Sequence, residues 1–414
     1  MHEYIPEELD IFSERPIIMS VNDSEIIEYS ALNSVENSTL LEFHSNSYGD
    51  RYKDLSNMYL KLKLKIVKHD GSDYVATDVE QGHLISNALH SIFRTAYTSL
   101  NGTNVHSVES NYHYKEFIET TMNYSVESAA SRLSTQLFIP DPTPAKLSEI
   151  SKNSAIFELY GRINLMNLDK LLIPNVDFNL RMSLENSDFF IKEKNEKKSI
   201  LKFLDAKLFI RHVIPNTEIL LAQEKMLGSG RPAVYQYKRG VVLTQNLAKG
   251  VTNLNIQNFY NGGIKPCMIL FSMVENASYV GTRTSSPHEF KHFGLNTFSF
   301  TINGMNRPSN PYEMKDNCYS HVFSRLYETL GYQNSDKSSM VNLKNFSTNR
   351  FFMAHDLTNN NMALSDVEDP YSNCNIGVTG TFSTPLQTPI SCILYLLLPS
   401  RFEISANREV KVII

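Results

Sequence analysis

Residues 89–124, LHSIFRTAYTSLNGTNVHSVESNYHYKEFIETTMNY, carry strand, turn and helix signals in unbroken succession, and they decide the fold. The apolar residues that alternate along residues 91–100 are Ile92, Ala96 and Leu100 on one side and Phe93 and Tyr97 on the other. This alternation predicts a strand that is covered on both faces. The Asn101-Gly102 dipeptide that follows favours the two positive φ angles of a type I′ hairpin turn.

After this hairpin the spacing of apolar residues changes to that of a helix. One helical face, at positions i, i+3, i+4 and i+7, would hold Tyr114, Phe117, Ile118 and Thr121. The same order returns in the second half of the chain, where alternating apolar residues lead into Asn303-Gly304. A second helical pattern then holds Phe323, Leu326, Tyr327 and Leu330, and Glu119-Thr120 is echoed by Glu328-Thr329. We therefore expect two copies of one structural module.

The bulk properties agree with a folded protein of two domains. The chain has 414 residues, and one hydrophobic core usually fills roughly 250 to 300. Hydrophobic residues make up 42% of the chain and charged residues 20%, which excludes a disordered protein. The formal net charge of −5 offers no basic surface, so we expect no sequence-specific nucleic acid as a partner.

The sequence also predicts the compartment in which the protein is made. Its four cysteines show neither a CxxC pair nor a metal-binding spacing, so free thiols are expected. The N-terminal MHEYIPEELD is acidic and lacks the apolar core of a signal peptide. The most apolar run, residues 390–398, is shorter than the roughly 20 residues that a membrane-spanning helix needs. We expect a soluble protein that is made inside the cell, is not secreted by a signal peptide and does not span a membrane.

Strand patterns dominate the rest of the chain. The clearest is residues 57–67, NMYLKLKLKIV, where leucines and lysines alternate as in a sheet with one buried and one wet face. Further strand candidates are residues 29–32, 40–44, 155–165, 176–184, 201–214, 233–247, 251–259, 267–274, 297–302, 351–355, 378–382, 390–398 and 410–414. Many short strands with few helices favour an all-β fold of two jelly-roll sandwiches side by side, a double jelly roll with a few short inserted helices.

Four segments of the chain follow from these patterns. Residues 1–28 show no sustained period, and we interpret them as an N-terminal arm that finds its partners on another surface. Residues 29–217 are expected to form the first jelly roll and residues 233–414 the second. The segment between them, 218–232, reads as a helical connector that ends at a Gly-Ser-Gly-Arg-Pro sequence.

Residues 288–292, HEFKH, match the HExxH pattern of zinc proteases. That chemistry needs a stable helix, because two imidazoles one turn apart must hold the metal while the glutamate polarises a water. Pro287 precedes the string and a glycine follows two residues after it, which leaves about two helical turns at most. We therefore interpret the string as a loop entering a strand, and we expect His288, Glu289 and His292 to bind no metal.

No other chemical signature stands out in the sequence. Gly228-Ser229-Gly230 lacks the third glycine of a dinucleotide-binding loop, and GxSxG, Walker A and deaminase zinc patterns do not occur. His90, His106 and His113 are interpreted as strand and turn histidines. We expect no catalytic residues, no cofactor and no enzymatic activity.

Several short segments, taken in order, resemble the double jelly-roll major capsid (hexon-like) proteins of Polinton/Maverick elements and adintoviruses. They are LDIF at 9–12, YKDLSN at 52–57, NALHSIF at 87–93 leading to LNG at 100–102, YHYK at 112–115 leading to Glu119-Thr120, YGR at 160–162, LFIR at 208–211, FKH at 290–292, FMAHDL at 352–357 and ISANR at 404–408. The resemblance covers essentially the whole chain. The departures from the family pattern are the absence of Trp and divergent loops over residues 333–350.

The resemblance implies a structural role in the capsid of a virion. Two jelly rolls would lie side by side in each chain, three chains would form a pseudo-hexagonal homotrimer, and trimers would tile an icosahedral shell. The implied partners are other copies of the chain and a penton-like minor capsid protein, and residues 1–28 are expected to cross to a neighbouring subunit. The repeat fits this, because a trimer of two-module chains presents six similar edges.

Three alternatives stay open. A carbohydrate-binding jelly roll would carry aromatic and polar loop residues at one end of the sandwich, but the chain has no Trp, a favoured side chain for stacking on sugars. An enzyme would rest on the string at 288–292 alone. A minor, penton-like capsid protein is a closer alternative, although such proteins usually need one jelly roll and this chain has room for two.

Overall fold

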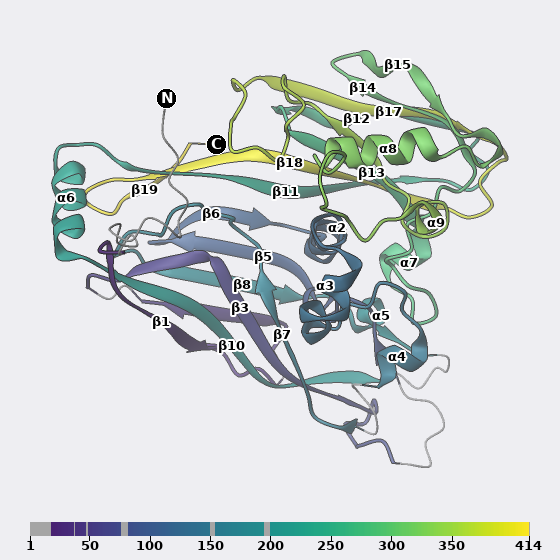
Figure 1. The fold of residues 1–414 in the computed structure, drawn as a ribbon. Helices are drawn as coiled ribbons and strands as arrows, with labels where there is room; N and C mark the ends of the chain where they lie inside the picture. The colour runs from purple at the N-terminus through teal and green to yellow at the C-terminus, as the bar shows by residue number, and fades with distance from the viewer. Residues whose placement is uncertain are drawn as a thin grey trace, which may run out of the picture.

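The computed structural model describes residues 18–36, 38–46, 49–75, 82–149, 154–193 and 199–413, which form two β-sandwiches stacked one above the other (Figure 1). The first sandwich occupies the lower half of Figure 1 and the second occupies the upper half. The pairings between the strands named below are antiparallel.

Within the described residues the first sandwich contains two four-stranded sheets. One has the order β1 (Val21–Ser30), β10 (Ile200–Pro215), β3 (Tyr52–Val67) and β7 (Phe157–Ile163). The other has the order β2 (Leu40–Ser45), β8 (Phe178–Leu184), β5 (Phe93–Leu100) and β6 (Thr103–Val108). The short strands β4 (His83–Leu84) and β9 (Ile191–Lys192) pair beside this sandwich.

The second sandwich repeats this arrangement. One sheet has the order β11 (Ala233–Leu247), β18 (Ile390–Ile404), β13 (Met268–Glu275) and β16 (Met353–Asp356), with β19 (Val410–Val412) added to β18. The other has the order β12 (Asn253–Ile264), β17 (Asn373–Phe382), β14 (Leu295–Ile302) and β15 (Met305–Glu313).

The strand order of the two sandwiches is identical once β4, β9 and β19 are set aside. In each sandwich the first, eighth, third and sixth strands make one sheet, and the second, seventh, fourth and fifth make the other. This is the jelly-roll order, in which an antiparallel hairpin is folded over to make two facing sheets. The all-β double jelly roll and the internal repeat predicted from the sequence are therefore confirmed.

The helices lie between strands. They are α1 (Ala88–Ser91), α2 (Tyr112–Asn123), α3 (Val126–Ala130), η1 (Arg132–Gln136), α4 (Pro144–Ser148), α5 (Ser187–Phe190), α6 (Thr217–Gly228), α7 (Asn276–Val280), η3 (Lys315–Asn317), α8 (Ser320–Thr329) and α9 (Leu343–Phe346). Helices α2 and α8 each follow the fifth strand of their sandwich, so the prediction of two helices at matching places is confirmed. Helix α6 connects β10 to β11 at the side of the molecule (Figure 1).

Both Asn-Gly turns have the predicted geometry. The φ angles are 46° and 81° at Asn101 and Gly102, and 48° and 81° at Asn303 and Gly304. The hairpin that joins β14 to β15 therefore matches the one that joins β5 to β6. The sequence did not predict strand β15, because this strand contains two prolines, is mostly exposed and shows no apolar period.

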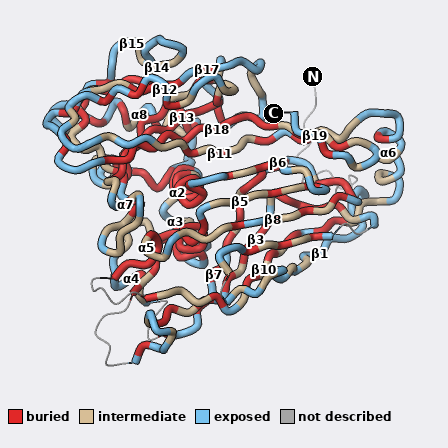
Figure 2. Tube along the Cα trace, turned by 180° about the vertical axis from the view of Figure 1, so that it is seen from behind, coloured by how far each residue is buried: buried red, intermediate tan, exposed pale blue. Residues whose placement is uncertain are grey.

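The burial of the strands explains their sequence patterns. In β3 the leucines at 60, 62 and 64 are buried in the first sandwich, and the lysines at 61, 63 and 65 point outward. The prediction of a sheet with one wet face over residues 57–67 is therefore confirmed. Strand β18 is buried on both faces from Ile390 to Ser400, which explains its continuous apolar run. Figure 2 shows this difference between the buried strand β18, the alternating strand β10 and the largely exposed strand β1.

The prediction of an arm over residues 1–28 is wrong in its C-terminal part. Residues 1–17 lie outside the described residues, but Val21–Ser30 forms strand β1 and pairs with β10. The side chains of β1 are largely exposed on both faces, so the strand is held by backbone hydrogen bonds to β10. Its sequence therefore shows no apolar period. The first sandwich therefore begins at Val21 rather than at residue 29.

We predict that Gly102→Ala and Gly304→Ala each lower the free energy of unfolding by about 1–2 kcal/mol. Nothing lies within 4 Å of an added Cβ at either position, so the cost arises from the φ of +81° alone. Unfolding in urea, followed by circular dichroism, measures the loss. The matched control is Gly228→Ala at the end of α6, where φ is not positive and the space is open. Its effect should stay within about 0.5 kcal/mol, and equal losses in all three variants would contradict the prediction.

Candidate functional site

Helix α2 belongs to the first sandwich but is enclosed by the second. Ten of its twelve residues are buried. On its aromatic side, the ring of Tyr114 stacks on Tyr279, and the ring of Phe117 stacks on His288 with centroids 4.0 Å apart. Tyr279 and His288 both lie in the segment between β13 and β14. Ring stacking therefore packs α2 of the first sandwich against the second.

The polar side of α2 lies beneath β11 and β18. The Tyr395 hydroxyl on β18 donates a hydrogen bond of 2.9 Å to the Glu119 carboxylate. On β11, a Cβ added at Gly240 would lie 2.3 Å from the same carboxylate and 2.7 Å from the Tyr395 ring. A side chain at residue 240 would therefore displace both groups, which explains the glycine at this close approach.

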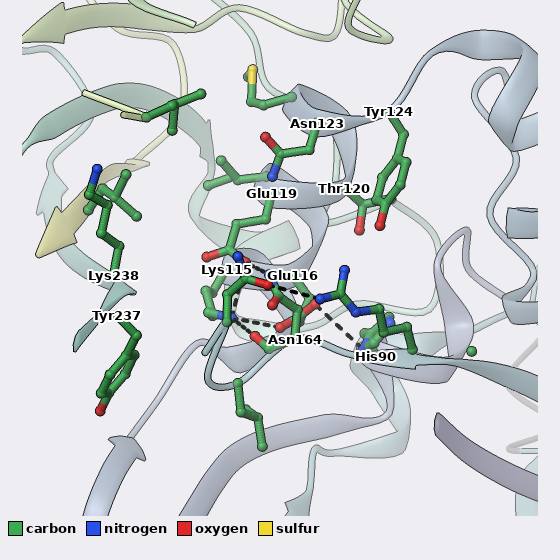
Figure 3. Close-up of a pocket in the computed structure, with 18 of the residues that line it drawn as sticks. His90, Lys115, Glu116, Glu119, Thr120, Asn123, Tyr124, Asn164, Tyr237 and Lys238 are labelled. Atoms are coloured by element: carbon green, nitrogen blue, oxygen red, sulfur yellow. Dashed lines mark hydrogen bonds and ion pairs between the residues drawn. The ribbon is translucent and has the colours of Figure 1, made fainter. Parts of the chain in front are cut away.

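A buried cluster of charges results on α2 (Figure 3). The Lys115 ammonium lies 2.7 Å from Glu116 and 3.1 Å from Glu119, and it donates a third hydrogen bond of 2.6 Å to the Asn164 carbonyl. Lys115 and Glu116 are buried almost completely. The Asn164 side chain donates to Glu119 at 3.2 Å. The ammonium thus has three acceptors, and each carboxylate accepts at least one hydrogen bond from a protein group.

Burial and pairing act in opposite directions on these three groups. Burial raises the pKa of both Glu116 and Glu119, and the nearby Lys115 ammonium offsets only part of that rise. For Lys115 burial alone would lower the pKa, but the two carboxylates outweigh it and the pKa lies above its usual value. The ammonium is therefore the group that keeps the two carboxylates tolerable where little water reaches them.

A cavity of about 810 Å³ lies beside this cluster, at the corner between the two sandwiches. Tyr59, Tyr160 and Arg162 line it from the first sandwich, and Lys238 and Glu368 line it from the second. Its walls carry both signs of charge, and Arg162 is bonded to the Ser56 carbonyl and to Asn167. The described lining therefore offers polar contacts, and the Lys115, Glu116 and Glu119 charges are paired with one another.

The HExxH string lies in the loop that leads into β14, as the sequence analysis predicted, and not on a helix. His288 is buried against Phe117, and neither of its ring nitrogens has a hydrogen-bond partner among the described residues. Burial holds the pKa of His288 well below its usual value. Glu289 pairs with Lys291 at 2.8 Å, and His292 accepts a hydrogen bond from the Gly294 amide. The three side chains thus have separate surroundings, and the expectation that they bind no metal stays a prediction.

The other singled-out histidines are buried at or near α2. His106 lies on strand β6, as predicted, whereas His90 and His113 lie on helices α1 and α2 and the strand-and-turn interpretation is wrong for them. Helix α1 is a single turn, too short to show a period in the sequence. Burial, together with the Lys115 charge, lowers the pKa of His90 to about 3.

Two arginines of the second sandwich complete the junction. Arg283 reaches across to Asp188 at 2.6 Å and to Glu193 at 2.5 Å. The buried Arg350 donates to the His288 carbonyl at 2.7 Å and to the Pro140 carbonyl of the first sandwich at 3.2 Å. Burial lowers the pKa of Arg350 to about 10. These contacts fix the orientation of one sandwich on the other.

Sequence reasoning missed this charge cluster. The apolar face of α2 was recognised, but Lys115, Glu116 and Glu119 fall on the face that the pattern leaves for solvent. The available signal was the spacing of Lys115 and Glu119, which are four residues apart and form an ion pair on one helical turn. Nothing local in the sequence indicates that a second sandwich covers them.

The structure also bears on the expected free cysteines and on membrane-spanning helices. Cys267, Cys318, Cys374 and Cys392 are free thiols, as predicted. Over the described parts of the chain, none of the helices has the length and apolar character needed to cross a membrane.

Comparison with known proteins finds a distant likeness in sequence and a likeness in fold. No protein-family model matches the chain. An uncharacterised protein of Caenorhabditis elegans is 20% identical over 323 residues, which cover 72% of this chain and 74% of that protein.

Several solved viral structures share the fold. A chain of the Sputnik virophage matches with a TM-score of 0.64 and 12% identity, covering all of this chain and 93% of its own length. A chain of the PBCV-1 virus capsid matches with a TM-score of 0.59 and 8% identity over 97% and 99% of the two chains. The mavirus major capsid protein matches with a TM-score of 0.56 and 9% identity over 99% and 93%. At these identities the likeness is one of fold.

We predict that Lys115→Met costs about 3–5 kcal/mol of folding free energy at pH 7, because two buried carboxylates lose their counter-ion. A carboxyl group whose pKa is raised by folding contributes stability at low pH and loses that contribution as the pH rises through the raised value. Protonation of Glu116 and Glu119 should therefore return part of the loss as the pH falls toward 5. Urea unfolding at both pH values measures it.

The matched control for this variant is Lys63→Met, which removes an exposed lysine from β3. Its effect should stay within about 0.5 kcal/mol at both pH values. A loss for Lys115→Met that is independent of pH would contradict the pairing described above.

We predict that His288→Phe makes the protein more resistant to acid. The pKa of His288 is lowered by burial, so its contribution to stability is present above the ordinary pKa and is lost as the pH falls below it. At about 1.4 kcal/mol per pH unit, the wild type should lose roughly 2 kcal/mol relative to the variant between pH 6.5 and 5. Phe preserves the stack on Phe117, and urea unfolding at each pH measures the difference.

The exposed His69 provides the control, since His69→Phe should follow the pH dependence of the wild type. Elemental analysis of protein purified without chelators should find no stoichiometric zinc. Zinc that is present at one equivalent and lost in His292→Ala would overturn our interpretation of the HExxH string.

Proposed function

We propose that this chain is a structural major capsid protein, that three copies form a pseudo-hexagonal homotrimer, and that trimers tile an icosahedral viral shell. The observation that carries this proposal is the repeat of one complete jelly roll, with an identical strand order, inside one polypeptide. The fold shared with the mavirus major capsid protein and with a chain of the PBCV-1 capsid supports it.

The junction described above suits such a building block. Three chains with two similar modules each give six similar units, which match a hexagonal lattice although the true symmetry is threefold. That match requires a fixed angle between the modules. Enclosure of α2, together with the contacts of Arg283 and Arg350, supplies the rigidity.

The proposal needs no catalysis. Assembly through complementary shape and buried area needs stable faces, and the charged groups at the junction are engaged in pairs and hydrogen bonds with one another. We propose that the partners are other copies of the chain and a penton-like minor capsid protein at the vertices, and that the protein resides in the virion. Kinship with Polinton/Maverick elements and adintoviruses is part of this proposal and rests on the nine short sequence segments.

We predict that the purified protein sediments with three times the mass of one chain, and that electron microscopy of any larger species shows hexagonal units or closed shells. Analytical ultracentrifugation over a wide range of concentration makes the test. A chain that stays monomeric at every concentration and binds glycans on an array would overturn the proposal in favour of a carbohydrate-binding jelly roll.

A further inference from the structure

Each sandwich presents one buried histidine to the other. His106 on β6 of the first sandwich packs against Tyr237 on β11 of the second, with ring centroids 5.9 Å apart. His288 of the second sandwich stacks on Phe117 of α2 in the first, with centroids 4.0 Å apart. The two histidines are 1% and 3% exposed. The junction between the sandwiches therefore encloses two groups that ordinarily titrate near neutral pH.

The surroundings of both rings suit only their neutral form. The four ring nitrogens of His106 and His288 have no hydrogen-bond partner among the residues that the structure describes. A protonated imidazole carries two N–H donors, and a buried charge without acceptors costs far more free energy than a buried neutral ring. Protonation of either ring is therefore opposed for as long as the two sandwiches stay in contact.

The charges around His106 add to this opposition. Burial holds the pKa of His106 well below its usual value, and the charges of Lys115 and Arg239 lower it further. Lys115 belongs to α2 of the first sandwich and Arg239 to β11 of the second. A third positive charge between these cations is repelled until water reaches the site.

The charges around His288 act in the same direction. Burial holds the pKa of His288 well below its usual value, and His113, Arg350 and Lys192 lower it further. Arg350 also donates a hydrogen bond of 2.7 Å to the His288 carbonyl, so this cation is fixed beside the ring. The Ser86 backbone favours the charged ring, but its influence is the weakest and it makes no hydrogen bond of normal geometry.

We propose that the junction is an acid-released latch, in which protonation of His106 and His288 separates the two sandwiches below about pH 6 while each sandwich keeps its own sheets. Separation exposes both rings to water, where an imidazole takes up a proton near pH 6.5. The chain passes between the sandwiches at α6, so α6 remains as their connection in the open form. The inference rests on the proposed function for its consequence, which is that a shell of such chains loosens in a mildly acidic compartment.

Other titrating groups at the junction modify this release. Burial raises the pKa of Glu116 and Glu119, so their contribution to the closed form grows as the pH falls. Glu119 accepts a hydrogen bond from Tyr395 of the second sandwich, so it opposes release. Burial would raise the pKa of Glu185, but its bond to His113 outweighs burial and the pKa is lowered. Its contribution to the closed form is lost only below about pH 4.3, after release.

Fluorescence energy transfer between the two sandwiches measures the opening in the full-length chain. One dye is placed at Ala130→Cys of α3 and the other at Lys249→Cys in the turn between β11 and β12, and both positions are exposed. Cys318→Ser removes the exposed native thiol, and the other three cysteines are buried. Labelled chains are diluted into unlabelled chains, so that transfer stays within one chain. Transfer should fall between pH 6.5 and 5 while far-UV circular dichroism is retained.

The double variant His106→Phe/His288→Phe isolates the two imidazoles from the other titrating groups. The opening constant of the wild type, divided by that of the variant, should rise about 1,000-fold between pH 6.5 and 5. Each imidazole accounts for about 30-fold, so the two single variants carry the test if the double variant does not fold. Urea at one fixed concentration brings the opening into the measurable range. The control is His69→Phe, which changes an exposed residue and should leave the opening constant of the wild type unchanged at each pH.

Three results would overturn the inference. They are a ratio of opening constants that does not change with pH, a wild-type chain that keeps its energy transfer at pH 5, and a far-UV signal that is lost together with the transfer. Sedimentation at pH 7 tests the proposed function separately. A trimer that never opens contradicts the latch alone, and a chain that opens but never forms a trimer contradicts the proposed function alone.

Discussion

The structure depends on the enclosure of one helix of the first sandwich by the second. Lys115 and Glu116 of α2 are buried and Glu119 is largely buried, which is costly for each charge alone. The arrangement is stable because the ammonium contacts both carboxylates and because Asn164 and Tyr395 complete their hydrogen bonds. Since Tyr395 belongs to the second sandwich, the set is complete only when both sandwiches are in place. The two halves therefore behave as one rigid unit.

That rigidity has a structural purpose in a protein made of two similar modules. The orientation of one sandwich on the other depends on several close contacts. The close approach at Gly240, the ring stack of His288 on Phe117 and the reach of Arg350 to the first sandwich all fix this orientation. A repeated module with a fixed internal angle is the geometric requirement for a closed ring of chains.

Equivalent elements of the two sandwiches differ in burial. Among the described residues, α8 and β15 are far more exposed than their counterparts α2 and β6. The stacked rings of Tyr59 and Tyr160 line the cavity between the two sandwiches, together with Lys238 and Glu368 of the second.

The sequence by itself determined the elements and their repeat. The two Asn-Gly hairpins, the alternation in β3 and the helical spacing of α2 and α8 are local patterns, in which backbone geometry and one buried face dictate residue type. Tertiary structure alone decided the rest. Strand β1 is held by backbone bonds to β10 and leaves no apolar period, so it was mistaken for part of an arm. The charge cluster on α2 was equally invisible, because a polar helix face looks the same in sequence whether water or a second sandwich covers it.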